Sequence, residues 1–185
     1  MSKAAFIDRD GVINEDRGYV YRSADFAFIS GAAAALRELR AAGFLLVVVT
    51  NQSGIARGLY READFHELTA HMREQLAAEG VSLDAIEYCP HLPDAQVPQY
   101  RLDCECRKPR PGMLLTSAQR LNIDPAQSIL VGDRRADIEA GRAAGVARCY
   151  LVRSGKPLST SDTAGADGVF RDLAHCVAEV LSQVR

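Results

Sequence analysis

Short apolar runs alternate with longer amphipathic stretches along the whole chain. The apolar runs have the length of buried strands and predict five of them, at Ala4–Asp8, Leu45–Thr50, Ala85–Tyr88, Ser128–Asp133 and Ala147–Val152. The stretches between them have helical spacing, which predicts helices at Ala32–Ala42, Glu62–Glu79, Gly112–Leu121, Ala136–Ala144 and Leu173–Ser182. This alternation is typical of a doubly wound α/β protein with a mainly parallel sheet and right-handed crossovers.

The length and charge of the chain set limits on what it can be. Its 185 residues fit one domain, 1–185, and the Ser-, Thr- and Gly-rich segment Ser154–Gly168 is expected to be a surface loop within it. Charged residues make up 25% with a net charge of -2, which argues against a nucleic-acid partner. No apolar run reaches membrane-spanning length and no signal peptide is visible. We therefore expect a soluble, cytoplasmic protein without a membrane partner, and a monomer.

Two carboxylates stand where the first predicted strand ends. Asp8 and Asp10 are one residue apart, in the segment Phe6–Asn14. Strand ends of parallel sheets are where ligands bind, and close carboxylates repel each other unless a cation or a shared proton intervenes. Oxygen-only ligation favours Mg²⁺. The alternative is an ordinary turn, since Asp and Gly also make turns.

Other polar residues are expected to meet the two carboxylates. Thr50 and Asp133 also end apolar strands, and Lys108 precedes a helix, so all should gather at the carboxyl edge of the sheet. A strand-end hydroxyl and a lysine can hold a phosphoryl group, and Asp133 suits the metal. Taken singly, they could be a polar turn or a solvated basic loop. Asp137 could orient Arg134 or a metal-bound water, or cap the next helix.

Three of the five cysteines lie close together with a histidine. Cys89 and His91 form one pair, and Cys104 and Cys106 form a second after twelve intervening residues. Residues two apart in extended chain face the same side, so each pair can bind one ion. Three thiolates and one imidazole predict a closed, structural Zn²⁺ site at 89–106, against the alternative of free thiols and a surface histidine.

The remaining cysteines and histidines carry no such pattern. Cys149 and Cys176 are predicted to be core thiols. His66, His71 and His175 lack ligand spacing and are expected at the surface.

The order of these motifs resembles the haloacid dehalogenase superfamily of phosphatases. The resemblance rests on Asp8-x-Asp10-Gly11, then Thr50, then Lys108, then Gly132-Asp133-x-x-x-Asp137, and covers nearly the whole chain. It implies that Asp8 is the nucleophile and forms an aspartyl-phosphate, with Asp10 as general acid and then base. It also implies that Mg²⁺ is held by Asp8, the Asp10 carbonyl and Asp133, and that Thr50 and Lys108 stabilise the phosphoryl group.

The loops narrow the resemblance further. The two segments between Gly11 and Ala32 and between Tyr88 and Lys108 are too short for a cap domain, so we expect a capless enzyme. The loops resemble the heptose-bisphosphate phosphatase family, which implies removal of the 7-phosphate from a phosphorylated sugar in nucleotide-activated heptose biosynthesis for the lipopolysaccharide core. The resemblance implies substrate contacts at Asp16, Arg17, Gly18, Tyr19, Thr50, Asn51, Gln52, Ser53, Arg107, Lys108 and Arg134. Arg107 would bind the phosphate that remains, and Arg134 stands where the family commonly has Lys.

Two other functions stay open at this point. Histidinol-phosphate phosphatases resemble the chain in their zinc pattern, but their zinc loop is typically shorter and the segment Ser53–Gly58 favours the heptose reading. A non-catalytic zinc module is the alternative from another class, and the intact Asp8 and Asp10 argue against it. The sequence leaves the preferred sugar anomer open.

Overall fold

The computed structural model describes residues 1–182, and the last three residues of the predicted domain lie outside this range. Six parallel strands form one sheet in the order β3-β2-β1-β4-β5-β6. The strands are β1 (Ala4–Ile7), β2 (Leu45–Asn51), β3 (Ala85–Cys89), β4 (Ile129–Gly132), β5 (Arg148–Val152) and β6 (Gly168–Phe170). The strand order reverses direction between β1 and β4, and ligands bind at such switch points.

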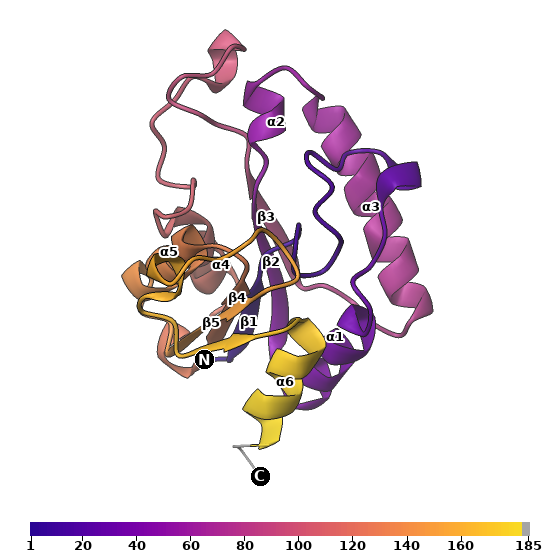
Figure 1. Ribbon diagram of the computed structural model, residues 1–185, viewed down its shortest axis with the longest axis vertical. Coiled ribbons are helices and arrows are strands. Elements are labelled where there is room, and N and C mark those ends of the chain that lie inside the picture. Colours follow the sequence, from indigo (N-terminus) through magenta and orange to yellow (C-terminus); the bar gives the residue numbers. More distant parts are fainter. Residues whose placement is uncertain (183–185) are drawn as a thin grey trace.

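Helices cover both faces of the sheet (Figure 1). They are α1 (Ala32–Ala41), α2 (Ser53–Ala56), α3 (Glu62–Ala78), α4 (Gly112–Arg120), α5 (Arg135–Ala143) and α6 (Leu173–Ser182). Because successive strand residues point to opposite faces, Ala5 and Ile7 of β1 pack with α1, α3 and α6, whereas Ala4 and Phe6 pack with α4 and α5. The two apolar layers fix the register of the central strands, and with it the positions of their last residues.

The predicted α/β architecture is confirmed, with two additions. The five expected strands and five expected helices are present, and their ends differ from the prediction by one residue at most. The segment Ser154–Gly168 is not a loop throughout, because Gly168 begins β6 at the edge of the sheet. The four-residue helix α2 was also not predicted. Both elements are too short to show a period in the sequence.

Neither connection that could carry a cap contains a second sheet within residues 1–182. The segment between Gly11 and α1 holds one 3-10 turn, Ser23–Asp25, and an isolated antiparallel bridge between Asn14 and Phe28. The segment between β3 and α4 reaches past the sheet, where Val97 donates its N–H to Ala56 O of α2 at 3.0 Å (Figure 1). The fold is therefore capless, as expected.

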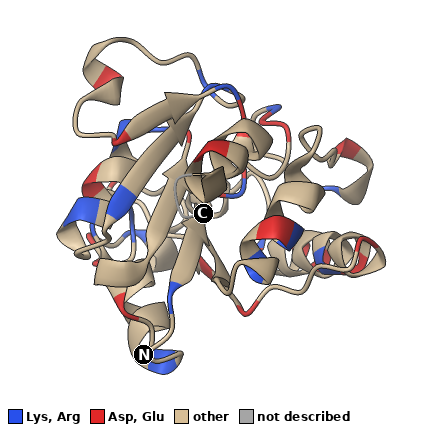
Figure 2. Ribbon diagram, turned by 90° about the horizontal axis from the view of Figure 1, so that it is seen from below, with Lys and Arg blue, Asp and Glu red and all other residues tan. Residues whose placement is uncertain are grey.

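Surface features agree only in part with the sequence analysis. Figure 2 shows Lys and Arg interspersed with Asp and Glu on the helices and loops in view. None of the helices within 1–182 has the length and apolarity that membrane crossing requires. His66 and His175 are exposed, as predicted, whereas His71 is only partly exposed, with its ring 6.1 Å from that of Phe26. Cys149 and Cys176 are buried core thiols, as predicted.

Candidate active site

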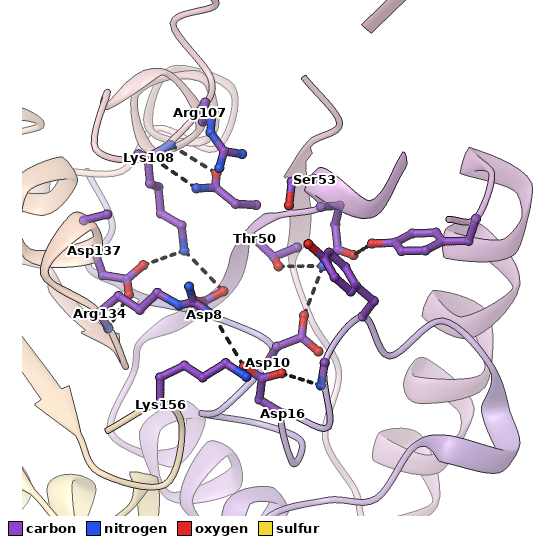
Figure 3. Close-up of a pocket in the computed structure, with 16 residues that line it drawn as sticks. Asp8, Asp10, Asp16, Thr50, Ser53, Arg107, Lys108, Arg134, Asp137 and Lys156 are labelled. Atoms are coloured by element: carbon purple, nitrogen blue, oxygen red, sulfur yellow. Dashed lines mark hydrogen bonds and ion pairs between the residues drawn. The ribbon is translucent and has the colours of Figure 1, made fainter. Parts of the chain in front are cut away.

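The expected residues meet at the carboxyl edge of the sheet. Asp8 follows β1, Thr50 lies in β2 and Lys108 precedes α4, and all three line one cavity of about 320 Å³ (Figure 3). Asp133 does not line this cavity, but its carboxylate groups with those of Asp8 and Asp137, which do line it. Residues far apart in the sequence are brought together because parallel strands end at the same edge.

Three buried carboxylates form the floor of the site. One oxygen each from Asp8, Asp133 and Asp137 lies within 4.8 Å of the others. Burial raises the pKa of Asp8 to about 8, with Lys108 opposing the change and the neighbouring carboxylates adding to it. Burial and the charge of Asp137 raise the pKa of Asp133 to about 6. The cluster therefore carries more negative charge than its protein surroundings balance.

The carboxylate cluster fits a magnesium ion. The buried Asp133 Oδ1 accepts no hydrogen bond from the residues within 1–182, although Arg134 Nε lies 3.7 Å away. A buried carboxylate oxygen without a partner is costly, and oxygen-only donor sets suit Mg²⁺. The backbone at Gly11 has φ +84°, and a Cβ there would lie 2.6 Å from Asp133 Oδ2, so glycine is required beside this carboxylate.

Lys108 supplies the cation of the site. Its ammonium lies 3.2 Å from Asp8 Oδ1 and 2.5 Å from Asp137 Oδ1, and it donates to Val49 O at 2.8 Å. The side chain is buried, which disfavours its charge, but the two carboxylates outweigh burial and raise the pKa of Lys108. Lys108 is therefore held as a fixed cation beside Asp8. Asp137 also caps α5 by accepting the Arg134 N–H at 2.9 Å, one of the roles expected for it.

The side-chain amides of Asn51 and Gln52 form hydrogen bonds with other residues of the site. Asn51 holds the backbone of Lys108 from both sides, donating to its carbonyl and accepting its N–H, each at 3.1 Å. Gln52 donates to Thr50 Oγ1 at 2.8 Å and to Asp10 Oδ2 at 3.1 Å, and accepts the Tyr60 hydroxyl at 2.5 Å. Both side chains line the cavity, but their amides order the loops around it.

Asp10 is bound by a buried arginine that the sequence analysis did not single out. Arg9 is 1% exposed, and its Nη2 and Nε lie 2.9 and 3.1 Å from Asp10 Oδ2. Asn14 donates to Asp10 Oδ1 at 3.1 Å. The Asp10 carboxylate lies at the cavity wall, 23% exposed, in a fixed orientation. Alternation along the extended chain could have shown that Arg9 points away from its two acidic neighbours, but not that it folds back to Asp10.

The mouth of the cavity contains a further group of charges. The cavity is lined by six residues at which the sequence predicts substrate contacts: Asp16, Gly18, Tyr19, Ser53, Arg107 and Arg134. Arg17 does not line it, and its guanidinium pairs with Glu15 at 2.7 Å. Lys156 lines the cavity although the sequence analysis placed it in a surface loop.

The cysteine and histidine cluster forms beside this mouth. The three sulfurs of Cys89, Cys104 and Cys106 lie 3.1 to 3.5 Å apart. His91 Nδ1 lies 3.4 and 3.8 Å from the sulfurs of Cys106 and Cys89. Tetrahedral zinc with Zn–S bonds of about 2.3 Å gives S···S edges of about 3.8 Å, so the four donors fit one zinc ion with little adjustment. Arg107 donates to His91 O at 3.4 Å, which joins this cluster to the cavity.

The fold and the strand-end groups define a HAD-like phosphatase. The HAD-hydrolase-like family profile matches residues 105–176. The chain is 52% identical over 171 residues, 92% of this chain and 90% of the relative, to the D-glycero-β-D-manno-heptose-1,7-bisphosphate 7-phosphatase of Escherichia coli K12. It is 51% identical to the protein of the same name from Yersinia pestis, over 92% of this chain and 91% of the relative.

A solved structure agrees with these relatives. The D,D-heptose 1,7-bisphosphate phosphatase of B. bronchiseptica, complexed with magnesium and phosphate, superposes with a TM-score of 0.83 at 34% identity, covering 98% of this chain and 99% of that one. The chain belongs to the D-glycero-β-D-manno-heptose-1,7-bisphosphate 7-phosphatase family of HAD-like phosphatases.

Proposed function

We propose that this protein removes the 7-phosphate of D-glycero-β-D-manno-heptose 1,7-bisphosphate through an aspartyl-phosphate on Asp8. The observation that carries the proposal is the buried Asp8 carboxylate beside the Lys108 ammonium, 3.2 Å away, at the strand-end edge. The substrate and its β anomer come from the names of the E. coli and Y. pestis relatives, which share about half of this sequence. The product would serve the formation of nucleotide-activated heptose.

Asp8 is suited to attack phosphorus. Arg9 N–H and Lys108 both contact its Oδ1, at 2.7 and 3.2 Å, which fixes the carboxylate plane. In our proposal the carboxylate displaces the sugar oxygen and forms an acyl-phosphate, which water then hydrolyses, so that one difficult step becomes two easier ones. Asp10 gives its proton to the departing sugar oxygen and then accepts a proton from the attacking water.

The remaining groups stabilise the transferring phosphoryl group. Thr50 and the Lys108 ammonium face the cavity beside Asp8, where they can bind the equatorial oxygens as charge redistributes. Mg²⁺, held by Asp8, the Asp10 carbonyl and Asp133, would supply further positive charge at the same oxygens. Asp137 keeps Lys108 charged and in place, which is the role that its ion pair supports.

The position of Arg107 supports a substrate that carries two phosphates. It lines the same cavity as Lys108, but its guanidinium lies apart from the Lys108 ammonium and donates to His91 O of the zinc segment at 3.4 Å (Figure 3). A guanidinium can bind a phosphate with two parallel hydrogen bonds. We propose that Arg107 binds the phosphate at carbon 1 while the phosphate at carbon 7 reacts, and that zinc bound by Cys89, His91, Cys104 and Cys106 holds this loop in position.

The substrate assignment is tested by Arg107→Ala. The variant should lose roughly 10- to 150-fold in kcat/KM on heptose 1,7-bisphosphate, the range for a lost charge-assisted hydrogen bond, and much less on a simple phosphate monoester. Lys108→Ala should depress both substrates alike. Arg171→Ala is the control, because Arg171 is 79% exposed and does not line the cavity. Equal losses on both substrates for Arg107→Ala would count against a bisphosphate.

The choice of sugar is tested separately on the unmodified protein. One preparation should be assayed with the α and β anomers of the heptose bisphosphate and with histidinol phosphate. The proposal predicts the highest kcat/KM on the β anomer. A higher kcat/KM on histidinol phosphate would replace the proposal by the alternative weighed from the sequence.

A further inference from the structure

Three consecutive residues after β5 contact the candidate site, one at the Gly11 backbone and two at the Asp133 carboxylate. Ser154 Oγ donates to Gly11 O at 2.7 Å, beside the loop of the two acids. A Cβ on Gly155 would lie 1.9 Å from Asp133 Oδ2, so only glycine allows this close approach. Lys156 N–H donates to the same oxygen at 3.1 Å. The backbone of residues 154–156 is thus fixed against the proposed metal carboxylate, and we call these residues the clamp segment.

The clamp segment places the Lys156 ammonium at the mouth of the cavity. Its Nζ lies 3.1 Å from Asp16 Oδ2, and Arg134 Nη2 approaches the same oxygen at 3.5 Å (Figure 3). The Asp16 side chain is 7% exposed, whereas that of Lys156 is 46% exposed. Burial disfavours the charge of Asp16, but hydrogen bonds from Gly18 N–H and Lys156 outweigh it and lower the pKa of Asp16.

The stability of the fold does not account for this ion pair. A half-exposed lysine gains little from pairing with a carboxylate, because water screens the charges and the long side chain loses freedom. A carboxylate in the wall of a cavity that takes up phosphates would repel them unless its charge is balanced. Lys156 provides this balance at Asp16 Oδ2, while Asp16 Oδ1 accepts only the Gly18 N–H among residues 1–182, and Asp16 lines the cavity.

We propose that Lys156 is a positioning residue for substrate. It holds Asp16 in the cavity wall and balances the charge of this carboxylate, so that Asp16 can accept a hydrogen bond from a sugar hydroxyl. The inference rests on the proposed function, because it requires a sugar that carries both hydroxyls and phosphate. Lys156 acts through Asp16 and does not take part in the chemical step. The clamp segment thus connects the two parts of the site, because the Lys156 backbone contacts Asp133 and the Lys156 side chain contacts Asp16.

The test is the effect of Lys156→Ala on KM and kcat for heptose 1,7-bisphosphate. KM should rise by roughly 5- to 20-fold, the lower part of the range for a charge-assisted hydrogen bond because Lys156 is half-exposed. The kcat should stay within about threefold, since the interaction is uniform between ground and transition states. Lys156→Arg keeps the charge and should restore most of the KM. Arg135→Ala is the control, because the Arg135 side chain is about as exposed as that of Lys156 and pairs with Glu139, at 2.7 Å, outside the cavity.

A double-mutant cycle with Asp16→Asn tests whether Lys156 affects KM through Asp16. If Lys156 acts through Asp16, Lys156→Ala should change KM by less than about twofold in the Asp16→Asn background. Melting temperature and the Mg²⁺ affinity of Lys156→Ala, the latter by calorimetry, should match those of the unmodified protein, because the backbone N–H to Asp133 remains. An unchanged KM in Lys156→Ala, or the same factor in both backgrounds, would overturn the inference. Failure of the unmodified protein to hydrolyse the sugar bisphosphate would instead overturn the proposed function.

Discussion

The carboxylate cluster and the thiol cluster are built in opposite ways. Asp8, Asp133 and Asp137 come from three distant parts of the chain, and the sheet and α5 hold them together. Cys89, His91, Cys104 and Cys106 all lie within one excursion between β3 and α4. The carboxylates enclose a cation of their own, Lys108, at 2.5 and 3.2 Å.

This difference implies different roles for the two proposed metals, Mg²⁺ in the chemistry and zinc in the stability of its loop. The sheet holds the carboxylates whether or not Mg²⁺ is bound, so the ion is needed for chemistry and for balancing charge. The zinc segment contains little secondary structure, so bound zinc would provide much of the stabilisation that keeps it ordered. We therefore expect changes at the carboxylates to act on turnover, and changes at the thiols to act on stability.

The largest expected effect is that of Asp8→Asn. An amide cannot form the acyl-phosphate, so kcat should fall by at least about 10⁴-fold while the fold is retained. The measurement is steady-state kcat together with the melting temperature. Asp94→Asn, at an exposed position, is the control and should keep full activity. Near-normal turnover by pure Asp8→Asn protein would remove the nucleophile assignment.

Arg9→Met removes the cation behind Asp10. Methionine keeps much of the apolar packing of Arg9, but the Asp10 carboxylate loses its contacts at 2.9 and 3.1 Å. The kcat should fall by roughly 10- to 150-fold, as for other charged hydrogen bonds, and the pH profile of kcat should change. A variant with the kcat and pH profile of the unmodified protein would show that the orientation of Asp10 does not depend on Arg9.

Cys104→Ser should act mainly on stability. Bound zinc should fall below one per chain, and the melting temperature should drop by about 5 °C or more, because about 2 kcal/mol corresponds to several degrees in a chain of this size. Elemental analysis and thermal unfolding measure both. Cys176→Ala removes a buried thiol that packs in the other apolar layer from the cysteines of the cluster, and it should leave the zinc content unchanged. A zinc-free but fully stable and active Cys104→Ser protein would contradict the structural role of this cluster.

The last expected effect is a pH dependence of the stability of the metal-free protein. An unfolded Asp8 releases its proton near pH 3.8, whereas in the folded state its pKa is raised to about 8. Between these values the folded state binds more protons, so stability should fall as pH rises from about 4 to 8. Added Mg²⁺ should restore stability, most strongly at the upper end. Thermal melts across this range with and without Mg²⁺ test this, and a melting temperature independent of both would contradict it.

The sequence predicted the elements whose residues carry their own signal. Leu45–Asn51 is an uninterrupted apolar run that ends in two polar residues, so both the strand and its polar end could be expected. β6 could not, because Gly168–Phe170 has three residues and lies at the edge of the sheet. Its pairing with β5 depends on the course of the chain rather than on local composition.

The same distinction applies to the candidate site. Asp8, Asp133 and Lys108 could be placed together because each stands at a strand end or approaches the same sheet edge. Arg9 and Lys156 could not, because their partners follow from how loops fold back. Lys156 contacts Asp16 through its side chain while its backbone N–H contacts Asp133, a pairing that no local sequence pattern indicates.

The most direct test of the central claim is to find the phosphoryl group on the protein. The unmodified protein with Mg²⁺ and heptose 1,7-bisphosphate should be quenched in acid during the first turnover, digested and examined by mass spectrometry. The account predicts one phosphoryl group on the peptide that contains Asp8, and none on that peptide in Asp8→Asn. A phosphoryl group on another residue, or first-turnover product release without any phosphorylated peptide, would contradict it.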